Sequence, residues 1–471
     1  MADTAATETW RMGACALAER LERGAVSPVD LVEESFARIA RLDPVLNAFV
    51  HLDHEGARAA AAEAADRQRS GTRRGPLDGI PVSVKDNLYV AGMPARWGSL
   101  LLKDFVPPQD DICAERLKAA GAIIVGKTTT PEFALMGRTE SRLTGSTRNP
   151  WDPALTPGGS SGGAVASVAA GMVPLALGTD AGGSTRTPAS YTGLVGLRGS
   201  NGRVPRAFGF PPMALDFQAI GLFARSMADL DLLLSVLSAP DARDPTSRLL
   251  PPLRDESGPR RIGWFTGVGG HSADDAVIAS HADARAALAD AGHQLVEVAP
   301  PYDLDELADL WGTLTAAGAA RAADQLPGDK SLLTDQIAGL LAKGSAIGAM
   351  DYVRTVDRLQ AFRRTTSAQW GDVDALLIPS AASPAFDAAR AAPETIGGEP
   401  GSMKAQGMFG GWVNAMGYCG LNVPALPHPD GRPIGMQIVV RAGDDAVALG
   451  LGRALEAARP LADRWPLLAL S

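Results

Sequence analysis

The hydrophobic and polar positions change their period several times along the chain, which predicts alternating helices and strands. Residues 8–70 have helical spacing, and Ser27 followed by a proline is typical of a helix start. Turn residues begin at Gly75, and β-branched residues then alternate with other types up to Lys85. This change of period predicts a strand that ends at Lys85.

The same reasoning predicts the elements further along the chain. Helices are expected at 56–69, 111–120, 161–170, 226–237, 274–291, 304–323, 350–370 and 446–458, and strands at 122–125, 173–177, 261–265, 294–298, 375–379 and 435–440. Loops are expected at 178–187, 202–210 and 238–260, and 126–133 should turn into a further helix. Because helix and strand alternate from 75 to 458 without a clear linker, we expect an α/β sheet in one large domain, with a helical cap over 301–371.

Composition narrows the classes of function. The chain has 471 residues, a formal net charge of −9 and a pI near 5.3. These values argue against a general nucleic-acid or membrane-surface binder, because such proteins usually carry excess basic charge. The three cysteines are far apart and form no CxxC pair, which argues against a disulfide framework or a zinc cluster and favours the cytoplasm.

Signals for targeting and for metal binding are also weak. Residues 1–14 carry acidic groups and lack a basic segment followed by an apolar stretch, so no signal peptide is expected. The longest apolar run, 162–178, is interrupted by serine, glycine and proline, which argues against a membrane span. The six histidines form no HExxH pair, and His51 and His54 are expected on an exposed helix edge. We therefore expect neither a metal nor a cofactor.

Residues 156–188 carry the strongest chemical signal. They contain two serines flanked by glycines, Ser160 and Ser184, which are joined by a small-residue helix pattern and a short apolar run. Glycines on both sides of a serine let backbone N–H groups converge on one point, as an oxyanion beside a nucleophile requires. The stretch therefore predicts an active site, and at this point either serine is a candidate nucleophile.

Two general motifs match the chain but do not fit their context. Residues 158–162 match G-x-S-x-G, but a nucleophile elbow follows a strand, and the three prolines in 149–157 argue against a central strand there. Residues 121–128 match the phosphate loop G-x-x-x-x-G-K-[ST], but their middle four residues are Ala-Ile-Ile-Val. A buried strand followed by a turn is predicted there instead of a nucleotide site.

Lys85 is the candidate base, because no histidine lies in a catalytic motif and a neutral lysine can activate a serine. Neutrality at pH 7 requires that its pKa fall from about 10.4 to about 7, which costs about 4.6 kcal/mol at about 1.36 kcal/mol per pH unit. Burial at the end of a strand can supply this much. The alternative is an ordinary lysine paired with the adjacent Asp86.

Three motifs taken together resemble the amidase signature family. Its members carry a lysine in G-I-P-x-x-x-K-D, a GGSSGG loop and a D-x-GGS-x-R-x-P loop, which here occupy 79–86, 158–163 and 180–188. The spacings from Lys85 to Ser160 and from Ser160 to Ser184, 75 and 24 residues, also fit the family. Further similar pieces lie at 121–128, 149–152, 193–198, 422–427 and 433–438, so the resemblance covers most of the chain.

The resemblance implies a fold and an activity. The fold is α/β, a large mixed β-sheet sandwiched between helices in a single domain over 1–471. The implied parts are an N-terminal helical segment at 1–72, a core with the motifs at 73–240, a variable region at 241–400 with the possible cap at 301–371, and a C-terminal completion of the core at 401–471. The activity is hydrolysis of a C–N acyl bond in an amide, with carbamates and esters as further substrates of related enzymes. The alternative is the amidase subunit of a glutamyl-tRNA(Gln)/aspartyl-tRNA(Asn) amidotransferase, which releases ammonia from glutamine.

The resemblance also assigns roles to residues. It makes Ser184 the nucleophile, Ser160 a bridging serine in a cis peptide bond, and Lys85 the base. The backbone N–H groups of four successive residues would form the oxyanion hole: Ala181, Gly182, Gly183 and Ser184. Asp180 and Arg186 are expected to form a structural pair. Ser161 either bonds near Lys85 or caps the next helix, and capping is expected to be its main role.

The substrate pocket is the least constrained part of the sequence. Five residues are candidates for its entrance, and each is equally well explained as packing: Phe133, Leu135, Met136, Arg203 and Arg206. Apolar candidates favour an uncharged or aryl-bearing amide or carbamate. The expected partner is this small molecule alone, without nucleic acid or membrane, and the chain is expected to be a monomer or a homodimer.

Overall fold

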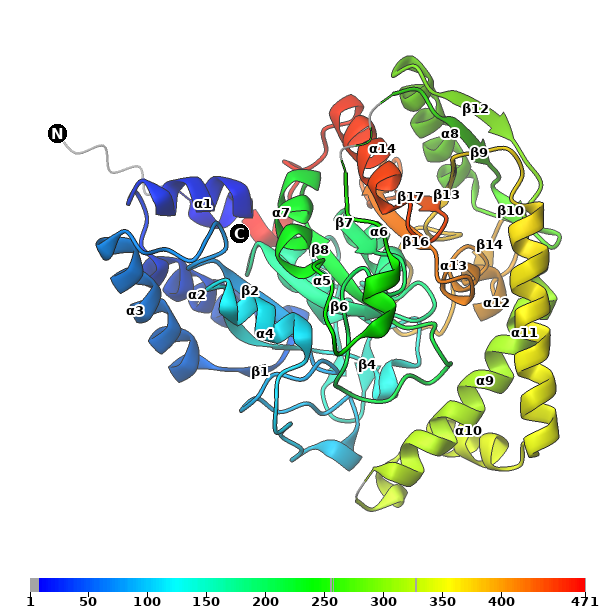
Figure 1. Ribbon diagram of the computed structural model, residues 1–471, viewed down its shortest axis with the longest axis horizontal. Coiled ribbons are helices and arrows are strands. Elements are labelled where there is room, and N and C mark those ends of the chain that lie inside the picture. Colours follow the sequence, from blue (N-terminus) through cyan, green and yellow to red (C-terminus); the bar gives the residue numbers. More distant parts are fainter. Residues whose placement is uncertain (1–7, 255, 257, 327, 471) are drawn as a thin grey trace.

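A large mixed sheet runs through the molecule (Figure 1), in a computed structural model that describes residues 8–254, 256, 258–326 and 328–470. Within these residues its strands lie in the order β1 (Phe49–Leu52), β3 (Ile123–Thr128), β2 (Pro81–Lys85), β6 (Leu175–Asp180), β8 (Ala219–Ala224), β7 (Val195–Arg198), β16 (Cys419–Pro424), β17 (Gly435–Val440), β13 (Ala375–Pro379), β9 (Arg261–Trp264) and β12 (Gln294–Glu297). The β3, β2 and β6 strands are parallel, whereas the pairs from β6 to β13 are antiparallel. The prediction of a large mixed sheet is confirmed.

Helices cover both faces of the sheet, which makes an α/β/α sandwich. One face packs against α2 (Pro28–Leu46), α3 (His54–Ser70), α5 (Gly162–Ala169) and α6 (Arg186–Thr192). The other packs against α1 (Ala14–Glu22), α4 (Ile112–Ala119), α7 (Met227–Leu237), α8 (Asp275–Asp290) and α14 (Asp445–Ala458). Short elements complete the described chain: η1 (Thr9–Arg11), η2 (Leu100–Leu102), η3 (Glu132–Ala134), η4 (Pro245–Leu249), η5 (Lys330–Leu332), β4 (Glu140–Ser141), β5 (Gly145–Ser146), β10 (Gly267–Val268), β11 (His271–Ser272), β14 (Thr395–Ile396), β15 (Glu399–Pro400), α12 (Met403–Gln406), α13 (Gly411–Ala415) and α15 (Leu467–Leu470).

Successive side chains of β2 alternate between the two faces of the sheet, which explains why Lys85 points into the interior covered by α5. Val82 and Val84 belong to the core on the α4 and α7 side. Ser83 lies on the opposite side, where its hydroxyl is 2.9 Å from that of Ser167 in α5. Because successive side chains of a strand alternate between faces, Lys85 points toward the N-terminal end of the same helix.

Three long helices lie together at one end of the molecule, opposite α2 and α3 (Figure 1). They are α9 (Leu304–Gln325), α10 (Asp335–Ser345) and α11 (Ala349–Gln369). Glu132 ties this group to the core, because its carboxylate accepts hydrogen bonds from the hydroxyl and backbone N–H of Thr334. They fall in the range where a cap is expected, and the single domain with a cap stays a prediction.

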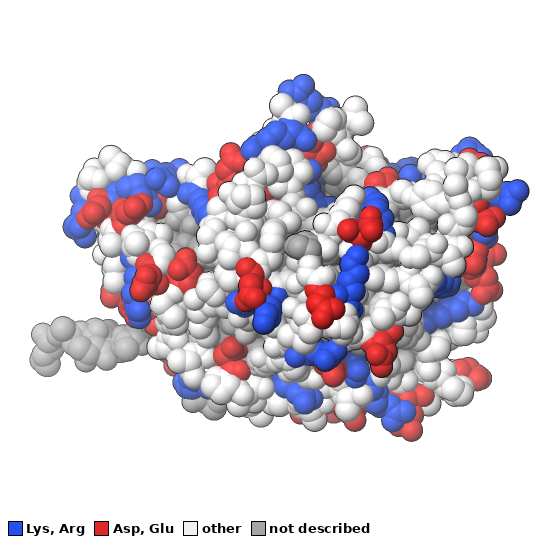
Figure 2. All heavy atoms as spheres, turned by 90° about the horizontal axis from the view of Figure 1, so that it is seen from below, with Lys and Arg blue, Asp and Glu red and all other residues white. Residues whose placement is uncertain are grey.

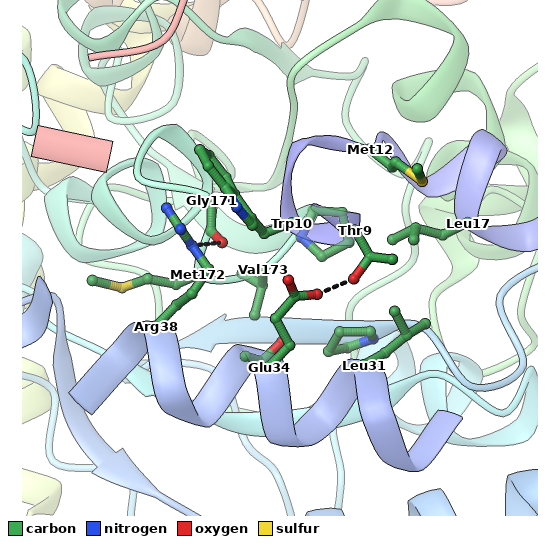
Figure 3. A pocket seen from close by; sticks show the side chains of 13 residues that line it. Thr9, Trp10, Met12, Leu17, Leu31, Glu34, Arg38, Gly171, Met172 and Val173 are labelled. Atoms are coloured by element: carbon green, nitrogen blue, oxygen red, sulfur yellow. Dashed lines mark hydrogen bonds between the residues drawn. The ribbon is translucent and has the colours of Figure 1, made fainter. Parts of the chain in front are cut away.

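The N-terminal segment is fixed against α2 by Trp10 (Figure 3). The Arg38 guanidinium lies 3.5 Å from the centre of the Trp10 ring and donates to the carbonyl of Gly171. Thr9 donates a hydrogen bond to Glu34. These contacts line a small hollow between α1 and α2. Residues 1–7, which carry half of the stretch used to argue against a signal peptide, lie outside the described residues.

The ends of several elements differ from those predicted. β3 continues through 126–128, where a turn was expected, because those residues pair with β1 on one side and β2 on the other. A short 3-10 turn follows it instead of the expected helix. Residues 8–70 are not all helical, since β1 forms the edge of the sheet. His51 therefore lies half-buried in a strand, and its expected place on an exposed helix edge is wrong.

Charges of both signs are interspersed on the face of the molecule drawn in Figure 2, with uncharged surface between them. Among the described residues, no helix has both the length and the apolar character needed to cross a membrane.

Candidate active site

Lys85, Ser160 and Ser184 form a continuous chain of hydrogen bonds. The Nζ atom of Lys85 lies 2.8 Å from Oγ of Ser160, which in turn lies 3.1 Å from Oγ of Ser184. Lys85 and Ser160 are buried, whereas Ser184 is partly open to solvent. The residue that a substrate can reach is therefore linked to a buried amine through one intervening hydroxyl.

Each of the three residues stands at the end of a regular element. Lys85 ends β2, Ser160 precedes α5, and Ser184 lies in the loop between β6 and α6. The peptide bond between Gly159 and Ser160 is cis, as expected. The loops that carry both serines therefore end on the side of the sheet that Lys85 faces.

Glycines allow these loops to approach so closely. A Cβ atom on Gly163 would lie 2.4 Å from Oγ1 of Thr129, and one on Gly178 would lie 2.8 Å from Oγ of Ser161. Any larger residue at these positions would push α5 away from the sheet. The glycine-rich pattern thus reflects close packing around the relay, in addition to the loop geometry.

Three hydroxyl groups surround the Lys85 amine. Besides Ser160, Ser161 lies 2.9 Å and Thr179 lies 3.1 Å from Nζ. Burial lowers the pKa of Lys85 to about 7, although the negative charge of Asp180 acts in the opposite direction. The amine is therefore balanced between its charged and neutral forms near neutral pH, as a base at this position requires. The alternative of a lysine paired with Asp86 is not observed.

The three hydroxyl groups around Lys85 differ in where their hydrogens are directed. Ser161 donates to the carbonyl of Thr179 at 3.2 Å, and Thr179 Oγ1 also accepts from Asn87 at 3.0 Å. Ser161 has thereby used its only hydrogen and accepts from Lys85, and Thr179 Oγ1 accepts from Lys85 as well as from Asn87. When Lys85 loses a proton, its lone pair can accept the hydrogen of Ser160. The Ser160 branch is therefore open to proton exchange, whereas Ser161 has no hydrogen left to give.

The expected capping role of Ser161 is wrong. Ser161 occupies the N-cap position of α5, but its side chain makes no capping hydrogen bond. The hydroxyl is instead used between Lys85 and Thr179. The competing expectation, a bond near Lys85, is the one observed.

Asp180 and Arg186 form the expected structural pair. The guanidinium donates to both carboxylate oxygens at 2.9 and 3.1 Å, and both side chains are fully buried. Burial alone would raise the pKa of Asp180, but Arg186 and the surrounding donors hold it well below its usual range. Asn414 of α13 bonds to both partners. The pair therefore anchors the loop of Ser184 to a distant segment of the chain.

Asp180 also determines which backbone N–H groups of the Ser184 loop remain free to bind an oxyanion. Its carboxylate accepts the N–H of Gly183 at 2.7 Å and that of Thr185 at 2.9 Å. The expected oxyanion role of Gly183 is therefore corrected, because its hydrogen points to the carboxylate. In the part of the chain that the structure describes, the N–H groups of Ala181, Gly182 and Ser184 have no acceptor.

Three of the five residues expected at the pocket entrance belong to the packing. Phe133 is buried, with its ring 4.9 Å from that of Trp97. Arg203 is buried in an ion pair with Asp445, and Arg206 donates to the carbonyl of Phe210. Phe133 and Arg203 are thus buried inside the fold, whereas Arg206 is half-buried, and the substrate role of all three stays a prediction.

Of the other two entrance candidates, Met136 lies near the relay, whereas Leu135 packs against the cluster that contains Trp97 and Phe133. Leu135 and Met136 are half-buried. The carbonyl oxygen of Met136 would lie 2.7 Å from a Cβ atom on Gly159, so its backbone touches the residue before Ser160. Met136 therefore borders the site, and its contact with substrate stays a prediction.

The two misleading motifs are explained by the structure. Lys127 of the phosphate-loop match is buried in β3, where its amine donates to the carbonyl of Leu88. The stretch is thus a buried strand, as expected, but the turn predicted at its end is part of the strand. Residues before Ser160 form turns and an isolated bridge instead of a strand, so the nucleophile elbow is absent there.

Thr179 and Asn414 are functional neighbours that the sequence reasoning missed. Thr179 stands in β6 just before Asp180, where a search for hydroxyls beside the motif would have found it. Asn414 lies 228 residues after Arg186. Nothing in the local pattern marks it, because only the fold brings it to the loop.

Comparisons with known proteins agree with this geometry. A family model described as Amidase matches residues 30–449. An acylamidase of Rhodococcus erythropolis is 32% identical, with 97% of each chain covered. A glutamyl-tRNA(Gln) amidotransferase subunit from a Synechococcus strain is 34% identical, with 96% of this chain and 97% of the other covered. A solved 6-aminohexanoate cyclic dimer hydrolase bound to its substrate is 27% identical with a TM-score of 0.85, and the match covers 98% of this chain and 99% of the other.

Proposed function

Because the chain belongs to the amidase family, and is therefore a hydrolase of carbon–nitrogen bonds other than peptide bonds, we propose that it works through an acyl-enzyme on Ser184. Ser184 is the nucleophile, Ser160 the relay and Lys85 the base. The observation that carries this proposal is the chain of hydrogen bonds from a buried lysine to a solvent-accessible serine. A serine becomes a strong nucleophile only when its proton has such a destination.

The first half of the reaction forms the acyl-enzyme. The Oγ atom of Ser184 attacks the amide carbon while its proton passes to Ser160, whose own proton passes to neutral Lys85. The carbonyl oxygen becomes an oxyanion beside the N–H groups of Ala181, Gly182 and Ser184. Loss of one such donor typically costs about 3 kcal/mol of transition-state stabilisation.

The second half restores the enzyme. Ser160 gives its proton to the departing nitrogen and receives one from Lys85, so that the amine leaves as a neutral molecule. Water then attacks the ester of Ser184 and gives up its proton along the same path. The carboxylic acid is released, and Lys85 is neutral again after the proton has returned to Ser184.

The proposed substrate is a small, uncharged amide or carbamate, and esters are further candidates. The half-buried, apolar Met136, whose backbone contacts Gly159 beside the relay, supports this class. We propose that no metal or cofactor takes part, because the relay itself provides a base and an acid. The proposed location is the cytoplasm. The chain is proposed to act as a monomer or homodimer and to form one domain with a cap.

A second candidate function is the amidase subunit of a tRNA-dependent amidotransferase. The observation in its favour is the 34% identity to such a protein over nearly the whole chain. Side-by-side hydrolysis of an aryl amide, an aryl carbamate and glutamine by the isolated chain separates the two. Turnover of glutamine alone would favour the second candidate.

Labelling with a serine-directed fluorophosphonate, followed by peptide mapping, tests the mechanism. The adduct is expected on Ser184 and should be absent from Ser184→Ala. The Ser160→Ala variant should label slowly, because Ser184 then lacks its route to Lys85. An adduct on Ser160 of the native chain, or no adduct, would show that the proposed mechanism is wrong.

A further inference from the structure

Trp311 of α9 lies directly against the loop that carries Ser184. A Cβ atom on Gly182 would lie only 2.6 Å from Cη2 of the Trp311 ring. The indole therefore touches the backbone of a residue whose N–H group has no acceptor among the described residues. Trp311 is also half-buried, so part of the residue remains accessible.

The surroundings of the ring are apolar. The Phe217 ring lies 5.6 Å away at an angle of 40°. On another side, a Cβ atom on Gly411 would lie 3.8 Å from Cε3 of Trp311 and 3.7 Å from a methyl group of Leu307. The loop, the indole and these apolar neighbours thus form one wall at the loop that carries Ser184.

The relay fixes which part of a substrate meets this wall. The departing nitrogen must receive its proton through Ser160, so the amine faces the loop before α5. That side is bordered by the backbone of Met136, which contacts Gly159. Trp311 borders the other loop, at Gly182. The acyl group is thus directed away from the relay and toward the indole.

We propose that Trp311 determines specificity by packing against the acyl group of the substrate, and that it selects flat apolar acyl groups over small ones. This inference rests on the proposed acyl-enzyme at Ser184. Aromatic contacts favour such groups beyond the burial of apolar area alone.

Boronic acids provide the test, because boron forms a tetrahedral adduct with an active serine and its organic substituent replaces the acyl group. The affinities of phenylboronic and methylboronic acid are measured by calorimetry for the native chain, Trp311→Ala, Trp311→Phe and Trp264→Ala. Trp264 is a matched control, since it is also half-buried but lies in β9. Melting temperatures check that each variant is folded.

The native chain is expected to prefer phenylboronic acid, and Trp311→Ala should reduce this preference at least tenfold. Trp311→Phe, which keeps an aromatic face and is the milder change, should retain part of it, and Trp264→Ala should retain all of it. An unchanged preference in both Trp311 variants would overturn the inference. Loss of selectivity only between acetanilide and acetamide, which differ in the amine, would overturn it as well. Retained binding of both boronic acids by Ser184→Ala would instead contradict the proposed function.

Discussion

The Nζ atom of Lys85 lies 2.8 Å from Oγ of Ser160, so the buried amine reaches the accessible Ser184 only through a second hydroxyl. This relationship separates the three roles physically. The base is kept from water, which lowers its pKa, while the nucleophile remains where a substrate can reach it. One residue cannot satisfy both requirements, and the relay serine removes the conflict.

The pH dependence of activity should report the Lys85 amine. Because the base acts in its neutral form and its pKa is about 7, kcat/KM should fall below pH 7 and level off above it. Lys85→Ala should lose about 10²- to 10⁴-fold in activity and also lose this inflection. Lys127→Met is a matched control, because Lys127 is buried in the neighbouring strand but does not contact Ser160. Disappearance of the inflection in the control would contradict the assignment.

Ser161→Ala should have a smaller effect on rate than Lys85→Ala, and it should move the pH profile. The Ser161 hydroxyl accepts a hydrogen bond from Lys85, which favours the charged amine. Its removal should therefore lower the pKa of Lys85 and shift the rise in kcat/KM to lower pH. Ser167→Ala removes another buried hydroxyl, one turn into α5, without contacting Lys85. The same shift in both variants would mean that Ser161 acts only through packing.

Asp180→Asn should destabilise the fold and the loop together. It leaves the Arg186 guanidinium buried without its counter-charge, which typically costs about 3–5 kcal/mol in the free energy of unfolding. It also removes a negative charge that raises the pKa of Lys85, so the pH profile should move to lower pH. Denaturant titration and kcat/KM against pH measure the two effects.

The pair of Arg203 and Asp445 provides the control for Asp180. It is equally buried, but its partners include Ser200 and no residue of the relay. Asp445→Asn should cost similar stability while leaving the pH profile of the folded fraction unchanged. If both variants move the profile alike, the effect of Asp180 on Lys85 is not electrostatic.

The elements that the sequence predicts well are those whose pattern is local. The alternation before Lys85 and the caps of α2 and α7 depend on neighbouring residues, and these elements form as expected. β16 has no such pattern, because Gly420 and Asn422 weaken the signal of a strand. It forms because β7 and β17 pair with it on both sides.

The candidate site also combines features that local motifs predict with features that depend on the fold. The motifs identify Lys85, Ser160 and Ser184, since each carries its chemistry in its own segment. Which N–H groups remain free cannot be read locally. The Gly183 N–H is consumed by a carboxylate that is held in place by Arg186 and by Asn414, far along the chain. A role that depends on a third residue far along the chain can be assigned only when the fold is known.

Gly182→Ala should reduce activity by about 100-fold, and a second change should restore much of it. A methyl group there would meet the Trp311 ring at 2.6 Å, so either the ring or the loop must move. If the loop moves, the N–H groups beside the oxyanion are displaced, and a lost donor typically costs about 3 kcal/mol. Trp311→Ala in the same chain opens the space again, so the double variant should be more active than Gly182→Ala alone.

The coupling between the two sites, measured as a double-mutant cycle in kcat/KM, should lie in the range of about 0.5–3 kcal/mol. Gly339→Ala on α10 is the control, because nothing lies within 4 Å of the added methyl group and a helix gains about 0.5–1 kcal/mol from the change. Additive effects in the cycle would show that the indole does not constrain the loop.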